Sequence, residues 1–245
     1  MMTMTTREQM AGRIMVALDY PNAEAATSLI QQLEGIPCYM KVGMQLFYAA
    51  GPDFVRELKS RGYRVFLDVK MHDIPNTVKG GANSITKLGV DMFNVHAAGG
   101  VQMMQAAMAG VEEALAADPS LHKPTVIAVT QLTSTNERVM NEEIGIAGPV
   151  ADCVVRYAQL TKQAGLDGVV ASPQEVTLIK EACGTAFQTI TPGIRPAGSA
   201  IGDQSRVMTP AEAFKQGTDY IVVGRPITAA ANPREALESI LKELV

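Results

Sequence analysis

Short runs of Val, Ile, Tyr, Phe and Thr recur along the chain and alternate with longer, helix-patterned segments. Such runs are typical of buried β-strands. They occupy residues 13–20, 38–44, 64–71, 92–97, 125–132, 168–173, 188–194 and 220–226. Segments such as 22–35 and 51–62 have the helical pattern, and several of these segments end in a glycine before the next strand. Glycine closes a helix at low conformational cost.

Eight strand–helix units in a chain of 245 residues predict an α/β protein with a (β/α)₈ TIM-barrel fold. An open, doubly wound sheet is the alternative, but it usually needs fewer strands, and no Gly-x-Gly-x-x-Gly follows the first run. We expect one barrel domain over residues 13–245, preceded by an N-terminal extension of residues 1–12. The stretch 132–153 is expected to be a loop with a short extra helix.

Polar residues gather at one end of the predicted strands. They are Asp19, Lys41, Asp68, Lys70, Asn94, His96, Thr130, Thr133, Ser172, Arg195 and Arg225. In a (β/α)₈ barrel the carboxyl ends of the strands carry the active site.

The stretch "VFLDVKMHDIPNT", residues 65–77, concentrates charge at the end of an apolar run. Asp68 and Lys70 are two residues apart and therefore share one face of a strand. A solvated pair on a half-exposed strand is the simplest interpretation of such a pattern. Both faces of a parallel barrel strand are covered, however, and Asp19 and Lys41 are expected at matching heights nearby. These charges are therefore predicted to lie in the barrel mouth.

An alternating array of Lys and Asp keeps every group ionised, because each has an opposite neighbour. An array of this kind suits a reaction that forms a carbanion, since an ammonium group supplies both a stabilising field and a proton. A carboxylate beside a substrate carboxylate would also favour departure of the latter as CO₂.

The last two strands carry features of a phosphate site. Gly224 and Arg225 end the final strand, where barrel enzymes frequently bind phosphate. The connection 191–210 is long for a compact domain, and loops of this length are often lids. Arg195 and Gln204 lie on it and could grip an anion.

Composition narrows the possible classes of protein further. The net charge is −4 without a basic tract, which argues against a nucleic-acid surface. The chain has no apolar run of membrane-spanning length, and residues 1–12 lack a signal-peptide core, so we expect a cytoplasmic protein without a membrane partner. The three cysteines and three histidines form no metal or disulfide spacing, and no metal is predicted.

Several motifs resemble one known family over nearly the whole chain. They are "VALDY", "KVGMQLF", "FLDVKMHDIPNTV", "NVHAAGG", "VTQLTS", "DGVVASPQE", "TPGIRP", "GDQSRVMTP" and "VVGRPIT". The chain closely resembles the orotidine 5′-phosphate decarboxylases of bacterial type. The resemblance implies conversion of orotidine 5′-monophosphate to uridine 5′-monophosphate (UMP) and CO₂, the last step of de novo pyrimidine synthesis, with no metal or organic cofactor.

The resemblance also implies catalytic roles. The proton donor of the family matches Lys70, which is set in an array of Lys41, Asp68, Lys70 and Asp73. In the family, the residues that match Asp73 and Thr77 come from the partner subunit. A homodimer with shared active sites is therefore implied.

The residues that would bind the nucleotide follow from the same resemblance. Ribose is expected at Asp19, Lys41 and Thr77, next to Asp68, and the pyrimidine is expected near Thr133. The phosphate is expected at Arg195, Gly224 and Arg225. Gln204 would bridge the phosphate and the base.

Two other functions remain open. Related barrels, the 3-keto-gulonate-phosphate decarboxylases and hexulose-phosphate synthases, share the Asp-x-Lys-x-x-Asp pattern but use Mg²⁺ and an additional acidic ligand near the end of the second strand. That strand end carries Lys41 here. A catalytically inactive barrel that binds a nucleotide as a regulator is the other possibility.

Overall fold

The computed structural model describes residues 5–196 and 208–245. In these residues parallel strands close into a barrel, in chain order from β1 to β8, and β8 pairs with β1. The strands are β1 (Ile14–Ala17), β2 (Tyr39–Gly43), β3 (Arg64–Met71), β4 (Met92–His96), β5 (Thr125–Val129), β6 (Gly168–Val170), β7 (Gln188–Thr191) and β8 (Tyr220–Val223). The closed ring confirms the predicted (β/α)₈ barrel and excludes the open sheet.

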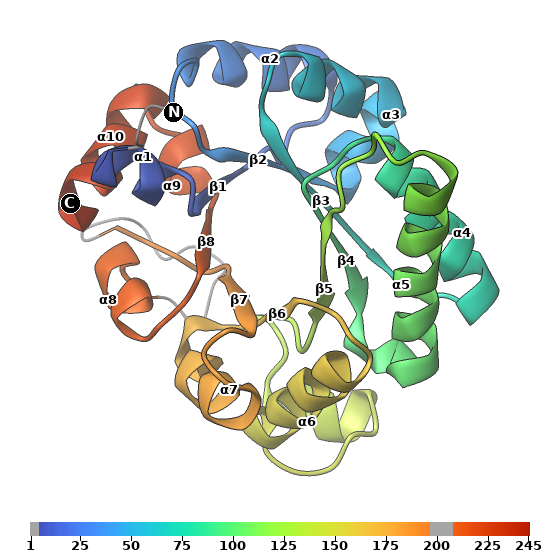
Figure 1. Cartoon of the computed structure of the whole chain (residues 1–245). Helices are drawn as coiled ribbons and strands as arrows, with labels where there is room; N and C mark the ends of the chain where they lie inside the picture. The colour runs from blue at the N-terminus through green and yellow to red at the C-terminus, as the bar shows by residue number, and fades with distance from the viewer. Residues whose placement is uncertain (1–4, 197–207) are drawn as a thin grey trace.

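Helices surround the strands on the outside of the ring (Figure 1). They are α1 (Thr6–Ala11), α2 (Ala23–Gln32), α3 (Met44–Ser60), α4 (Pro75–Lys87), α5 (Gly100–Ala117), α6 (Val150–Gln163), α7 (Val176–Cys183), α8 (Pro210–Lys215), α9 (Arg225–Thr228) and α10 (Pro233–Leu244). None of the helices in the described part of the chain has both the length and the apolar character that a bilayer crossing needs.

The strand β3 spans the predicted run 64–71, whereas the other strands are shorter than predicted, mainly at their carboxyl ends. The run 188–194 stops pairing at Thr191, because Pro192 has no N–H to donate. The residues beyond the strands form the loops at the barrel mouth. The predicted loop 132–153 contains a short π-helix, Val139–Glu143, as expected, but α6 begins at Val150, before the predicted end of the loop.

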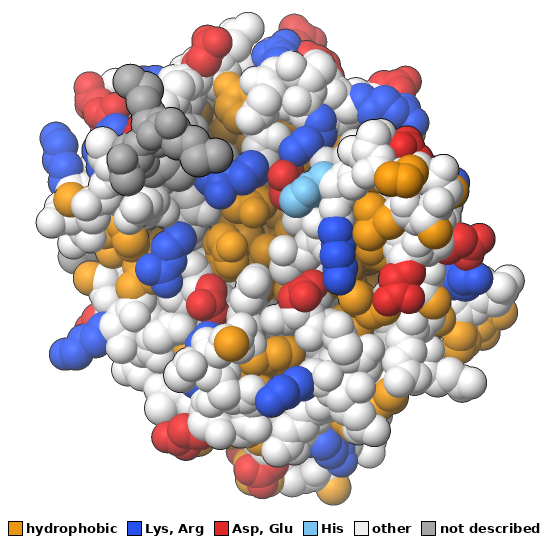
Figure 2. All heavy atoms as spheres, in the orientation of Figure 1, with side chains coloured by type: hydrophobic (Ala, Val, Ile, Leu, Met, Phe, Trp, Pro, Cys, Tyr) orange, Lys and Arg blue, Asp and Glu red, His pale blue; other side chains and the backbone are white. Residues whose placement is uncertain are grey.

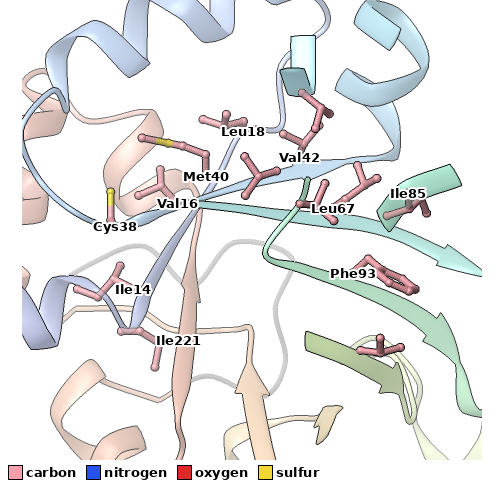
Figure 3. Close-up of a cluster of buried hydrophobic side chains, with 14 of the residues drawn as sticks. Ile14, Val16, Leu18, Cys38, Met40, Val42, Leu67, Ile85, Phe93 and Ile221 are labelled. Atoms are coloured by element: carbon pink, nitrogen blue, oxygen red, sulfur yellow. The ribbon is translucent and has the colours of Figure 1, made fainter. Parts of the chain in front are cut away.

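Alternation of side chains divides the core into two layers. In β1, Ile14 and Val16 point outward and join the large cluster between strands and helices, part of which Figure 3 shows. Met15 and Ala17 point inward and pack with Tyr39 and other residues in the barrel interior. All three cysteines are buried.

A Gly-x-Asp sequence precedes every second strand from β4 onward and fixes the floor of the barrel. The three aspartates are Asp91, Asp167 and Asp219. Each carboxylate accepts, at 2.7 Å, a backbone N–H of the preceding strand, from Val65, Val126 and Thr189 respectively. The backbone N–H of each aspartate donates in turn to the carbonyl of the strand residue that its carboxylate contacts, at 2.9–3.1 Å. Each of these three strands is therefore tied at its start to the strand before it.

The corresponding position before β2 is Pro37, which has no side-chain acceptor. Just before β1, the N–H of Arg13 donates to the carbonyl of Met10 in α1, at 2.9 Å, and the carbonyl of Arg13 accepts the N–H of Ile221 in β8. The helix α1 is itself fixed by a capping box, in which Thr5 and Glu8 satisfy each other's backbone N–H groups. The N-terminal helix therefore accepts a backbone N–H at the start of β1.

Candidate active site

The carboxyl ends of the strands surround a cleft of about 610 Å³. Among the residues predicted for the site, those that line it are Asp19, Lys41, Asp68, Lys70, Thr133, Arg195, Gly224 and Arg225. Its floor includes the apolar residues Ala17, Phe66 and Val222. Figure 2 shows the hollowed centre of this face, with hydrophobic atoms at its bottom and charged side chains around it. A ligand in the cleft would meet both kinds of surface.

Four charged side chains form a continuous chain along one side of this cleft. Lys41 Nζ lies 3.3 Å from Asp19 Oδ1 and 3.2 Å from Asp68 Oδ2. The other oxygen of Asp68, Oδ1, lies 2.6 Å from Lys70 Nζ. The side chain of Lys41 is only 9% exposed, whereas that of Lys70 is 28% exposed. Lys41 is therefore the inner, structural ammonium group, and Lys70 is the one that a ligand can approach.

The pairing keeps the buried members of this array ionised. Burial opposes the charge of Lys41, but the neighbouring Asp68 and Asp19 outweigh it and raise the pKa of the ammonium group. Burial likewise opposes the charge of Asp68, but Lys41 and Lys70 outweigh it and lower the pKa of the carboxyl group. Lys41 and Asp68 therefore hold opposite charges around neutral pH.

An irregularity in β3 sets the position of Lys70. Leu67 pairs with Phe93 of β4, and the next pair is Met71 with Val95, so the ladder is interrupted between them. Lys70 lies in this interruption with a φ of 50°, and it is the one non-glycine residue with positive φ in the described chain. Such a backbone is held in place by its surroundings and is often found at functional sites.

Two arginines and a glycine line the part of the cleft that lies next to β7 and β8. Arg225 follows Gly224 at the end of β8, and Arg195 lies just after β7. Arg195 is almost fully buried, and its guanidinium group donates to the carbonyl of Ile194 at 2.9 Å. The N–H of Arg195 donates to the carbonyl of Met208, also at 2.9 Å, which joins the two described ends of the long connection. Gln204 and most of the predicted lid lie outside the described residues.

Two of the predicted site residues do not line the cleft. Asp73 and Thr77 line an adjoining groove of about 740 Å³ between α3 and α4. Lys70 borders both this groove and the cleft. Asp73 accepts the N–H of Ile74 at 2.6 Å and lies on the turn that leads into α4. Within one chain, Asp73 and Thr77 therefore face away from the site that holds Asp19 and Lys41.

Other polar strand ends have structural roles. Thr130 is buried and donates to the carbonyl of Val170 at 2.9 Å. Ser172 caps the short helix that precedes α7. His96 accepts a hydrogen bond from the N–H of Ala98 and stacks on His72. Burial, His72 and Lys70 lower the pKa of His96. None of these three strand-end residues lines the cleft.

Sequence reasoning missed one contributor to the site and did not predict the contact of another. Gln131 is buried in the wall of the cleft, two residues from both Val129 and Thr133, which also line it. The alternation of side chains along an extended segment could have identified it. Asn94 was noted as a polar strand end, but its contact with Asp68 depends on the interrupted ladder, which the sequence does not reveal.

Comparison with known proteins places the chain among close relatives. Residues 12–240 match the model of the orotidine 5′-phosphate decarboxylase / HUMPS family. An orotidine 5′-phosphate decarboxylase of Moorella thermoacetica is 53% identical over 232 residues, which cover 95% of this chain and 92% of the relative. That of Bacillus cytotoxicus is 49% identical over 234 residues, which cover 96% and 98%.

Solved structures agree with these sequence matches. The crystal structure of orotidine 5′-phosphate decarboxylase from Lactobacillus acidophilus superposes with a TM-score of 0.84 at 43% identity, covering 94% of this chain and 97% of that chain. An uncharacterized conserved protein from Geobacillus kaustophilus gives the same TM-score at 41% identity, covering 95% and 100%.

Proposed function

The chain belongs to the orotidine 5′-phosphate decarboxylase / HUMPS family, and on this basis we propose that it converts orotidine 5′-monophosphate to UMP and CO₂. This reaction would be its part in pyrimidine synthesis, and we propose the cytoplasm as its location. Curated relatives at about half identity over nearly the full chain carry the name of this activity. The proposal extends that name to the residues of this chain.

One observation in the structure supports the proposal most directly. The ammonium group of Lys70 is partly exposed in the cleft and is held 2.6 Å from the carboxylate of Asp68. Lys41 neutralises the other oxygen of that carboxylate. A charged lysine in a cleft with an apolar floor is a suitable proton donor for a carbanion.

The reaction step can be written for these groups. The bond between C6 of the pyrimidine and its carboxylate breaks, CO₂ leaves, and the electron pair remains on C6. The ammonium group of Lys70 stabilises this negative charge and transfers a proton to C6. The lysine amine then regains a proton from solvent. Asp68, with Asp73, would keep Lys70 charged and directed at C6, and Lys41 would hold Asp68.

The rest of the nucleotide would occupy the remaining walls of the cleft. Arg195 and Arg225 carry the positive charge that a phosphate needs, and both line the cleft after β7 and β8. Gly224 permits close approach of the backbone there. Asp19 would accept hydrogen bonds from ribose hydroxyl groups, and Thr133 would contact the base; both residues line the cleft. We also propose that Gln204 bridges the phosphate and the base, as the resemblance to the family implies.

We propose that a homodimer completes each site. The groove that carries Asp73 and Thr77 is bordered by the exposed apolar side chains of Met44 and Tyr48. Ile74, beside Asp73, is also 67% exposed. A second copy placed on this groove would cover apolar surface and bring its own Asp73 and Thr77 towards the first copy's Lys70. Lys70 lines both the cleft and the groove, which supports this arrangement.

The Mg²⁺-dependent sugar-phosphate branch of the family is the alternative. The carboxylates of Asp19 and Asp68 are separated by the ammonium group of Lys41. Among the described residues no group of three or more His, Cys, Asp or Glu side chains is arranged to hold a metal ion. This donor set suits a charge array better than a Mg²⁺ site. Independence from a cofactor remains a prediction.

A decarboxylation assay tests the proposed function. The purified protein is mixed with orotidine 5′-monophosphate, and formation of UMP and release of CO₂ are measured with and without EDTA. Turnover that EDTA does not change is expected. Turnover that EDTA abolishes would favour the Mg²⁺-dependent chemistry. Binding of UMP without any turnover would favour a regulatory barrel.

A further inference from the structure

The side chain of Asn94 lies opposite the interruption of the β3–β4 ladder. Three residues of β3, Asp68 to Lys70, separate the paired positions Leu67 and Met71. On β4 only Asn94 separates the corresponding positions, Phe93 and Val95. The backbone ladder therefore cannot continue through this region, and its polar groups need other partners.

The side-chain amide oxygen of Asn94 supplies one of these partners. The N–H of Lys70 donates to Asn94 Oδ1 at 2.8 Å. Lys70 has the positive φ noted above, which costs a non-glycine residue conformational energy and persists only where surrounding contacts hold it. The hydrogen bond from Lys70 to Asn94 is one such contact, and it fixes the backbone from which the proton-donating side chain extends.

The side-chain NH₂ group of Asn94 contacts a member of the charged array, Asp68. Asn94 Nδ2 donates to Asp68 Oδ1 at 2.7 Å. The same oxygen receives the ammonium group of Lys70 at 2.6 Å. The side chain of Asn94 is completely buried, so solvent does not compete for either hydrogen bond. A single rigid amide therefore determines both where the backbone of Lys70 lies and where its carboxylate partner points.

We infer that Asn94 is a positioning residue, which aligns Lys70 and Asp68 for proton transfer without itself touching the substrate. The inference rests on the proposed decarboxylation. Asn94 does not line the cleft among the described residues, whereas Lys70 and Asp68 both do. Its effect should therefore fall on the chemical step and leave nucleotide binding nearly unchanged.

The chemistry of the two contacts requires an amide. The N–H of Lys70 can only donate, and the ionised carboxylate of Asp68 can only accept. Asn94→Asp keeps the size, and its ionised form keeps one acceptor, loses the donor and places a second negative charge beside Asp68. Asn94→Ala removes both contacts and leaves the N–H of Lys70 buried without this partner. Both variants should therefore lose the alignment, for different reasons.

The test compares these two variants with wild type and with Asn83→Ala as a matched control. Asn83 is an asparagine on α4 that donates to the carbonyl of Gly110, away from the cleft. We expect kcat of Asn94→Ala to fall by about 10²-fold, the usual scale for misplacing a catalytic group. The dissociation constant for UMP should change by less than about threefold, since binding groups are untouched. Asn83→Ala should keep the wild-type kcat.

A double-mutant cycle separates positioning from general destabilisation. In the Lys70→Ala background, Asn94→Ala should lower the residual rate by less than about threefold, because the group that it positions is gone. An equal loss in both backgrounds would overturn the inference. An Asn94→Ala protein that is folded by circular dichroism and keeps the wild-type kcat would overturn it as well.

The proposed function and this inference fail in distinguishable ways. Absence of turnover in wild type would reject the decarboxylation itself. Turnover in wild type with an unaffected Asn94→Ala variant would reject only the role of Asn94. If Asn94→Ala does not fold, Asn94→Leu, which fills the space but supplies neither hydrogen bond, gives the same comparison, and a wild-type kcat in that variant would equally reject the role.

Discussion

Mixing two inactive variants would show whether Lys70 and Asp73 act in one site from different subunits. The perturbation is Lys70→Ala in one preparation and Asp73→Ala in the other. Lys70 borders both the cleft and the adjoining groove, whereas Asp73 lines only the groove. In the proposed dimer each site combines Lys70 of one subunit with Asp73 of the other. Each variant alone should therefore have almost no activity.

The expected recovery follows from the symmetry of a two-fold dimer. In a hybrid, one site has lost both groups and the other keeps both. Random exchange of equal amounts gives about half hybrids, so activity should rise to roughly a quarter of wild type. At other mixing ratios, the recovery should follow the product of the two subunit fractions, with its maximum at equal amounts.

The assay is UMP formation after subunits have exchanged, with exchange verified by native mass spectrometry. The matched control mixes Lys70→Ala with Asp68→Ala. Asp68 contacts Lys70 within one chain, at 2.6 Å, so no hybrid of these two variants has an intact site. Recovery in the first mixture and none in the control is expected. Verified exchange without recovery in the first mixture would refute the shared-site reasoning.

Three further predictions concern single residues. Lys70→Ala should lower kcat by about 10²–10⁴-fold, the usual contribution of a general acid; a folded variant that keeps more than about a tenth of wild-type kcat would contradict its role. Arg225→Ala should cost about 1.5–3 kcal/mol in kcat/KM for the phosphorylated substrate, but leave turnover of orotidine, which lacks the phosphate, nearly unchanged; equal losses on both would reject phosphate binding. The lowered pKa of Asp68 means that its stabilising contribution is present above the ordinary value of 3.8 and lost as pH falls through the folded value. The raised pKa of Lys41 means that its contribution is present below 10.5 and lost as pH rises through the folded value. Chemical unfolding should therefore show a stability difference between wild type and Asp68→Asn that is constant from about pH 5 to 9; a decline within this window would count against the array.

The parts of the fold that follow from local pattern were predictable. Strand period, the polar strand ends and the glycines that close helices are properties of short segments. Several helices were expected to end in a glycine, and the glycines that follow them have positive φ: Gly35, Gly62, Gly89, Gly165, Gly184 and Gly217. The helix α1 also had a local signal, the Thr-x-x-Glu capping box at Thr5 and Glu8, which was overlooked.

Features that depend on pairing between distant segments could not be predicted. The interruption in β3 exists because of its register against β4, and the left-handed backbone of Lys70 follows from it. A lysine has no local preference for that conformation. The displacement of Asp73 and Thr77 into a separate groove likewise depends on the direction in which α4 leaves the barrel.

The hydrogen bond from Arg13 to Met10 makes α1 part of the barrel floor. Without α1, this N–H would lose its acceptor. The family match begins at residue 12, just after the helix. A relative without this helix would need another acceptor for the N–H at the position of Arg13. Among relatives, we therefore expect the absence of an N-terminal helix to covary with a different turn or a polar side chain that satisfies this N–H.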